Sequence, residues 1–212
     1  MSRAAAIKDG YTTGARRLAT RSISGLARTR VTPNALTASG VTLCAIASLL
    51  VAFENHNQYL FYWLGAATFV AGSILDILDG ALARAGGKST PFGAFLDSTT
   101  DRISEGFMLA AIAYVFAFHH RNVFVVVAVA AVAGSFLVSY TRARAEALGL
   151  KGDVGIGSRA ERVVVITAGL VLAPWGVLPW AIALLAATAW ITVGQRVLSV
   201  RRQLLARDSS SV

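Results

Sequence analysis

The 212-residue sequence has a single cysteine, Cys44, which lies within an apolar run. One cysteine excludes an intrachain disulfide framework and a cysteine-based zinc site. Acidic residues are also scarce: 11 Asp and Glu stand against 20 Lys and Arg, giving a formal net charge of +9. The basic residues gather at the ends of apolar runs and do not alternate with aromatics. We therefore expect them to meet an anionic membrane surface and not nucleic acid.

Apolar residues make up 55% of the chain, more than the roughly 45–50% of ordinary soluble proteins. Six stretches predict membrane-spanning helices, although the fifth is short and needs its flanking residues to reach across. They cover residues 35–53, 59–83, 92–118, 123–140, 163–173 and 177–200. The expected fold is an all-α integral membrane protein with six transmembrane helices.

The N-terminal segment, residues 1–32, is rich in Arg and Lys with apolar residues between them, and no continuous apolar region follows these charges. This composition excludes a cleavable secretory signal and predicts an amphipathic helix on the membrane surface. The six-helix domain would then cover residues 33–203, and the Ser-rich segment 204–212 would form a flexible tail.

The basic residues also predict the orientation of the chain, because cytoplasmic loops are enriched in Lys and Arg. With the N-terminus inside, every Lys and Arg except Arg121 falls on the cytoplasmic side of the six predicted helices. We expect a multi-pass protein of the cell membrane with both termini in the cytoplasm.

Four aspartates stand within, or at the edge of, the second and third apolar stretches: Asp76, Asp79, Asp97 and Asp101. An Asp at the centre of a membrane helix costs roughly 2.5–3.5 kcal/mol, so intramembrane acids indicate function. The first two are three residues apart and the second two are four apart, which places each pair on one helix face. The short turn between the two helices would direct all four carboxylates at one point on the cytoplasmic side.

Four carboxylates so close together repel one another unless a cation lies between them. Hard oxygen ligands favour Mg²⁺, with Mn²⁺ as the alternative, and four of them can hold two divalent ions. A pair of such ions can polarise a phosphoryl group and stabilise both the attacking and the leaving oxygen. The acids alone therefore predict phosphoryl or phosphatidyl transfer, with an ion or proton transporter as the remote alternative.

The acids belong to a longer pattern, Asp76-Ile-Leu-Asp79-Gly80-Ala-Leu-Ala83-Arg84 followed by Gly93, Asp97 and Asp101. It resembles the signature of the CDP-alcohol phosphotransferase family at every fixed position. The resemblance implies that Asp76, Asp79, Asp97 and Asp101 are ligands of a two-metal site and that Asp101 is the catalytic base. It also implies a CDP-lipid site and a homodimer packed through the third and fourth helices. The implied CDP-lipid site consists of Asn34, Thr37, Gly80, Ala83, Arg84 and Gly93.

The acceptor alcohol must be read from a second group, at the cytoplasmic ends of the later helices. Ser139, Arg142, Arg159 and Arg196 could hold a phosphate on the acceptor, because arginine pairs well with phosphate. The positive-inside rule alone would also place arginines there. The stretch 139–146 with residues 152–153 and 159–162 is similar to actinobacterial phosphatidylinositol phosphate synthases, which implies inositol 1-phosphate as acceptor and CDP-diacylglycerol as donor. Phosphatidylglycerol phosphate synthesis, from glycerol 3-phosphate, is the alternative. For the homodimer, Gly134 with Ala130 or Ser135 could provide close contact.

Overall fold

The computed structural model describes residues 32–85, 90–156 and 158–210, without the side chains of residues 33, 81, 83–85 and 208–210. The amphipathic helix expected at residues 1–32 therefore lies, except for its last residue, outside the described part of the chain.

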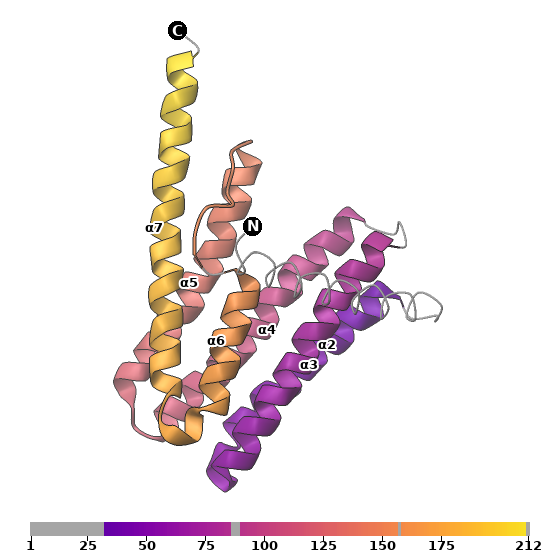
Figure 1. The fold of residues 1–212 in the computed structure, drawn as a ribbon, viewed down its shortest axis with the longest axis vertical. Helices are drawn as coiled ribbons and strands as arrows, with labels where there is room; N and C mark the ends of the chain where they lie inside the picture. The colour runs from indigo at the N-terminus through magenta and orange to yellow at the C-terminus, as the bar shows by residue number, and fades with distance from the viewer. Residues whose placement is uncertain (1–31, 86–89, 157, 211–212) are drawn as a thin grey trace, which may run out of the picture. The chain divides into compact units, whose positions relative to one another are not determined.

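The described residues are helical, with no strand among them, which confirms the all-α expectation (Figure 1). The elements in chain order are α2 (Pro33–Ala52), η1 (Glu54–His56), α3 (Gln58–Ala85), α4 (Pro91–Phe118), α5 (Asn122–Ala147), α6 (Arg159–Val171), η2 (Ala173–Trp175) and α7 (Leu178–Ser210). Six of them are α-helices that overlap the six predicted apolar stretches.

Within the described residues, four helices are long and apolar enough to cross a membrane: α2, α3, α5 and α7. The helix α4 has sufficient length but carries Asp97, Asp101, Arg102 and Glu105 over residues 97–105. The helix α6 has only 13 residues, and about 20 are needed to span a bilayer. The four long apolar helices make this a membrane protein, and the third and fifth predicted spans differ from the others through charge and length.

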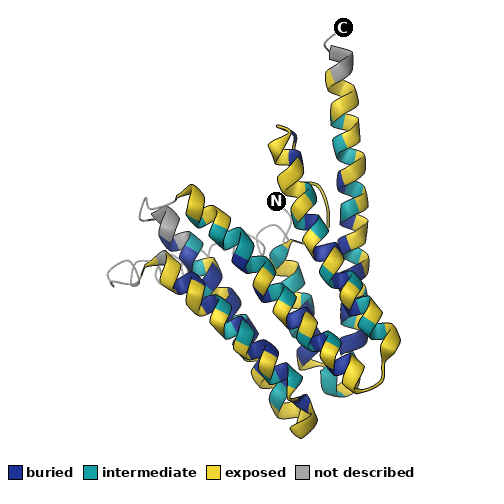
Figure 2. Ribbon diagram, turned by 180° about the vertical axis from the view of Figure 1, so that it is seen from behind, coloured by how far each residue is buried: buried dark blue, intermediate teal, exposed yellow. Residues whose placement is uncertain are grey.

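The chain divides into two compact units, residues 1–43 with 71–101, and residues 44–70 with 102–212. The second unit contains an apolar core to which α4, α6 and α7 contribute Met108, Leu109, Ile166, Leu170 and Ile182 among others. Large apolar side chains also cover the surface, as a lipid environment requires. Figure 2 shows the buried positions following one side of each long helix, with exposed positions along the other.

Small residues let α7 pack tightly against α5 and α6. A Cβ atom on Gly134 of α5 would lie 3.0 Å from Ala189 Cβ and 3.2 Å from the ring of Trp190. The Trp190 indole N–H in turn donates to the Ala130 carbonyl at 3.1 Å. Gly134 and Ser135 are thus buried inside the chain. The expectation that Gly134, with Ala130 or Ser135, serves a dimer contact is wrong, because Gly134 accommodates α7 of the same chain.

The last helix is longer than its apolar stretch predicts. The structure continues α7 to Ser210, where the sequence suggested a flexible tail from residue 204. The reason is a set of polar contacts outside the apolar pattern: Gln203 and Arg207 bind main-chain groups of residues 148–151. These contacts favour the helix beyond the point where apolar packing ends.

Candidate metal centre and arginine cluster

Three of the four predicted metal ligands meet at one point in the first unit. One carboxylate oxygen from each of Asp76, Asp97 and Asp101 lies within 4.8 Å of the others. Asp76 comes from α3, and Asp97 and Asp101 come from successive turns of α4. The sequence spacing therefore predicts the cluster correctly, since residues three or four apart share a helix face.

The fourth acid, Asp79, stands one turn after Asp76 and is 3% exposed. Its carboxylate is close enough to those of Asp76 and Asp97 for their charges to repel. The hydroxyl of Thr37 on α2 donates to Asp79 Oδ2 at 2.5 Å. This hydrogen bond fixes the direction of one carboxylate oxygen, so Thr37 supports the acid cluster directly.

Close packing of α2 on α3 makes the Thr37 contact possible. A Cβ atom on Gly40 would lie 3.0 Å from the Gly72 carbonyl and 3.6 Å from Asp76 Cβ. The two main chains touch because both positions lack a side chain. Gly40 and Gly72 were missed as site residues by sequence reasoning. Two glycines in apolar stretches are the only signal, and small residues are common there.

The donor set suits a hard divalent cation. All the converging groups are carboxylate oxygens, which Mg²⁺ and Mn²⁺ prefer over nitrogen or sulfur. Asp76 and Asp79 are 5% and 3% exposed, so water alone cannot screen their repulsion well. A bound cation supplies the missing positive charge, and the residues present therefore fit a metal centre.

The residues expected to bind the CDP-lipid lie at the ends of the same helices. Asn34 is exposed in the first turn of α2, and Gly80 directly follows Asp79. The Gly93 N–H donates to Thr90 Oγ1 at 3.0 Å, which caps the start of α4. The side chains of Ala83 and Arg84 lie outside the described residues.

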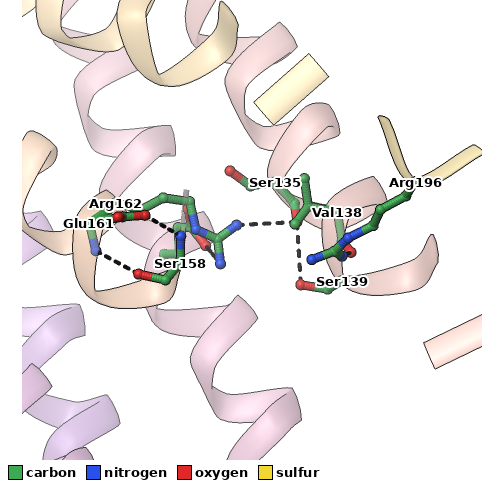
Figure 3. A network of polar contacts seen from close by, with 8 residues as sticks. Ser135, Val138, Ser139, Ser158, Glu161, Arg162 and Arg196 are labelled. Atoms are coloured by element: carbon green, nitrogen blue, oxygen red, sulfur yellow. Dashed lines mark hydrogen bonds and ion pairs between the residues drawn. The ribbon is translucent and has the colours of Figure 1, made fainter. Parts of the chain in front are cut away.

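The second unit contains an arginine cluster around α5. Arg196 of α7 is 9% exposed; its Nε donates to the Val154 carbonyl at 2.8 Å and its Nη1 to the Val138 carbonyl. Arg142 and Arg162 are close enough to repel the Arg196 guanidinium. Figure 3 shows Arg162 and Arg196 approaching the same stretch of α5 from two sides.

Arg162 of α6, which sequence reasoning did not select as an acceptor-site residue, also belongs to this cluster. Its Nη2 lies 3.5 Å from Glu105 Oε2, and both side chains are about one-tenth exposed, at 12% and 11%. Its Nη1 donates to the Ser135 carbonyl at 3.4 Å. Among the described residues, Arg162 Nε, Glu105 Oε1 and Ser135 Oγ are buried without a hydrogen-bond partner. These groups can bind further polar atoms.

The structure brings together only some of the predicted acceptor-site residues. Ser139 donates to the Ser135 carbonyl at 3.3 Å and so belongs to the stretch of α5 that Arg162 and Arg196 contact. Arg142 is exposed and forms an ion pair with Glu146 at 2.9 Å. Arg159 is half-buried in the first turn of α6. Ser158 is the N-cap of α6 and forms a capping box with Glu161, which starts the helix at Arg159.

Residues 30–194 match the family described as CDP-alcohol phosphatidyltransferase. A phosphatidylinositol phosphate synthase from Mycobacterium marinum is 39% identical over 183 residues, which cover 83% of this chain and 76% of that protein. An archaetidylinositol phosphate synthase from Methanothermobacter thermautotrophicus is 42% identical over 144 residues, which cover 66% of this chain and 71% of that protein.

Solved structures agree with these sequence matches. The crystal structure of Mycobacterium tuberculosis phosphatidylinositol phosphate synthase with CDP-DAG bound has a TM-score of 0.77 and 34% identity, covering 87% of this chain and 94% of that one. The same enzyme in complex with manganese and citrate has a TM-score of 0.77 and 33% identity, covering 86% and 88%. The signature acids, the matched length and the shared fold agree, and the chain belongs to the CDP-alcohol phosphatidyltransferase family.

Proposed function

We propose that this enzyme transfers the phosphatidyl group of CDP-diacylglycerol to a hydroxyl of inositol 1-phosphate, with release of CMP. The observation that carries the transfer reaction is the convergence of Asp76, Asp97 and Asp101, with Asp79 beside them. The relatives named for inositol phosphate transfer support the acceptor, and the mycobacterial structure with CDP-DAG supports the donor.

Asp76, Asp79, Asp97 and Asp101 would hold two divalent ions, Mg²⁺ or Mn²⁺, and the manganese complex of the mycobacterial relative supports this assignment. When bound, such ions neutralise phosphate charge and stabilise the oxygens that enter and leave the phosphorus. Thr37 keeps the Asp79 carboxylate in one orientation through its hydrogen bond. The rest of the chemistry is proton transfer and substrate positioning.

Asp101 is our proposed general base. It would accept the proton of the acceptor hydroxyl while the hydroxyl oxygen attacks the lipid-side phosphorus of the donor. The bond between that phosphorus and the bridging oxygen breaks, and the bridging oxygen leaves with CMP. A base in this position contributes roughly 10²–10⁴-fold to the rate.

The donor site would consist of Asn34, Thr37, Gly80, Ala83, Arg84 and Gly93. Supporting observations are the exposure of Asn34 at the start of α2 and the absence of a side chain at Gly80, beside the acid cluster. A nucleotide can approach main chain closely where glycine leaves room. Thr37 would then serve both sites, because it belongs to the donor site and also donates its hydroxyl to Asp79 of the acid cluster.

The acceptor phosphate would bind at the arginine cluster formed by Ser139, Arg142, Arg159 and Arg196, to which the structure adds Arg162. The repulsion that Arg142 and Arg162 exert on Arg196 supports this proposal, because a phosphate dianion beside Arg196 would relieve it. Arginine is also costly inside a membrane helix unless it is paired. The hydrogen bonds described for Arg196 go to main-chain carbonyls, and a phosphate-free alcohol would add no negative charge beside it, which argues against free inositol or serine as acceptor.

The finer topology follows the sequence prediction. We propose that α4 and α6 complete a set of six membrane helices in a domain over residues 33–203. Both termini would lie in the cytoplasm, and the active site would face that side. The segment 1–32 would lie on the membrane surface. A homodimer through the third and fourth helices, α4 and α5, is supported by the exposed apolar face of α5 at Val123, Val126 and Val129.

The purified protein in detergent, given CDP-diacylglycerol and Mg²⁺, provides the test. We expect CMP release with inositol 1-phosphate and little with glycerol 3-phosphate or free inositol. Release with glycerol 3-phosphate alone would replace the acceptor by the phosphatidylglycerol phosphate alternative. If no CMP is released with any alcohol, with or without metal, the proposed transferase activity is contradicted. The ion or proton transporter would then remain as the alternative.

A further inference from the structure

Four side chains on one face of α7 bind the main chain of residues 148–156, here called the α5–α6 connection. They are Thr192, Arg196, Gln203 and Arg207, whose spacings of four, seven and four place them in one line along the helix. The α5–α6 connection has no regular secondary structure of its own. Its shape in the described structure therefore depends on these contacts.

The two uncharged members of the line each bind one residue of the α5–α6 connection twice. The Thr192 hydroxyl accepts from the Ile156 N–H at 3.1 Å, and its single proton is within reach of the Ile156 carbonyl and of the Thr188 carbonyl in its own helix. The Gln203 amide accepts from the Lys151 N–H at 2.9 Å and donates to the Lys151 carbonyl at 3.0 Å. Paired bonds of this kind hold the peptide groups on both sides of one Cα atom and so fix the backbone of that residue.

The two arginines hold carbonyl oxygens between and beyond these points. Arg196 Nε binds the Val154 carbonyl at 2.8 Å. Arg207 binds the Leu148 carbonyl at 3.2 Å and the Gly149 carbonyl at 2.6 Å. The α5–α6 connection is thus held at its start, middle and end, in contact with a helix that is itself packed on α5 and α6.

Steric contact reinforces the hydrogen bonds near Thr192. Gly155 has φ +135°, and a Cβ atom there would lie 2.3 Å from Thr192 Cγ2. Only glycine combines this backbone conformation with the contact. At this point the main chain of the α5–α6 connection therefore rests directly on the Thr192 side chain of α7.

The α5–α6 connection leads into the arginines of the proposed acceptor site. At its far end the Ser158 N–H donates to Glu161 Oε2 at 2.6 Å, which starts α6 with Arg159 as its first residue. Arg162 follows one turn later and contacts α5. Guanidinium groups repel one another, so they stay within reach of one phosphate only if the backbone holds them there.

We infer that Thr192 and Gln203 are positioning residues for acceptor binding: they fix the α5–α6 connection and thereby keep Arg159 and Arg162 where, with Arg196, they can bind the acceptor phosphate. This inference rests on the proposed function for the identity of the acceptor. It assigns to α7 two uncharged side chains that would touch neither substrate. Their effect should appear in acceptor affinity and not in donor affinity.

The first test compares two threonines of α7 that are one turn apart. Thr192→Val keeps the side-chain shape and removes the bonds to Ile156 together with the contact to the Thr188 carbonyl of its own helix. Thr188→Val removes only contacts of this second kind, to the carbonyls of Leu184 and Leu185. Loss of two hydrogen bonds should raise the KM for inositol 1-phosphate about tenfold. The KM for CDP-diacylglycerol and kcat should stay within about twofold. Thr192→Ser, which keeps the hydroxyl, should restore the acceptor KM.

The second test compares two glutamines of α7. It remains informative if the Thr192 variant does not fold. Gln203→Met removes both bonds to Lys151 at a site farther along α7. Gln195→Met is the matched control, a half-buried glutamine of the same helix whose side chain has no hydrogen bond described to the α5–α6 connection. Calorimetric titration with inorganic phosphate, in the absence of donor, should show about tenfold weaker binding for Gln203→Met and wild-type binding for Gln195→Met.

The outcomes separate the two proposals. Wild-type protein that releases no CMP with inositol 1-phosphate contradicts the proposed function, while the phosphate titration still decides the role of Thr192 and Gln203. Equal acceptor KM and phosphate affinity in each variant and its control would overturn the inference. A second result would also overturn the inference: a lower kcat, weaker binding of both substrates and a lower midpoint of thermal unfolding in the same variant. That result would assign the bonds a purely structural role.

Discussion

Thr37 provides the sharpest test of the metal centre, because its hydroxyl acts on Asp79 through a single contact of 2.5 Å. Thr37→Val replaces this hydroxyl by a methyl group of nearly the same size. A hydrogen bond to a charged group contributes about 1.5–3 kcal/mol, and about 1.4 kcal/mol corresponds to a factor of ten. We expect the Mg²⁺ concentration that gives half-maximal CMP release to rise about 10- to 100-fold. The same factor is typical of residues that orient metal ligands.

Thr42→Val is the matched control on the same helix, since the Thr42 hydroxyl donates only to the Ala38 carbonyl of its own helix, at 2.8 Å. Metal titrations of CMP release, with Mn²⁺ binding followed by electron paramagnetic resonance, provide the measurement. If both valine variants require the same metal concentration as the wild type, Thr37 does not support the metal centre. A rise in the KM for CDP-diacylglycerol without any change in the metal response would likewise refute the reasoning and leave Thr37 as a donor-site residue only.

Three further changes test other parts of the structure. Asp97→Asn removes one of three converging carboxylates and should lower CMP release at least about 10³-fold, since a bound metal contributes several kcal/mol; activity within tenfold of the wild type would exclude the assigned centre. Arg196→Gln should raise the acceptor KM about tenfold or more, because hydrogen bonds to charged groups are strong, and an unchanged KM in steady-state kinetics would restrict Arg196 to its contacts with main-chain carbonyls. Gly155→Ala should lower the midpoint of thermal unfolding in detergent, because its Cβ would meet Thr192; a midpoint equal to that of Gly194→Ala, which has open space around it, would contradict the described contact.

The acid cluster could be predicted from the sequence because helical periodicity determines it. Asp76 and Asp79, like Asp97 and Asp101, share a helix face through spacing alone, and the two helices follow each other closely in the chain. The helices themselves follow from the lengths of the apolar stretches. These are local rules, and they hold whatever the remaining helices do.

The arginine cluster could be predicted only in part, because local rules do not decide it. Arg159 and Arg162 are three residues apart on α6, and the sequence cannot tell which of them meets Glu105. The contacts of Gln203 and Arg207 join residues more than fifty positions apart along the chain. Gly134 illustrates the same limit: a small residue in a membrane helix predicts close packing but does not say whether the neighbour is the same chain or another.

The burial of Cys44, at 3% exposed, has a practical consequence for experiments on this chain. A thiol reagent should leave the native protein unlabelled, and any cysteine introduced at an exposed position becomes the sole reactive thiol. Leu205→Cys would place this thiol near the C-terminal end of α7, and Asn122→Cys would place it at the start of α5. Both residues are exposed. An impermeant maleimide applied to intact cells would then label one variant and spare the other, which reports directly which compartment each end faces.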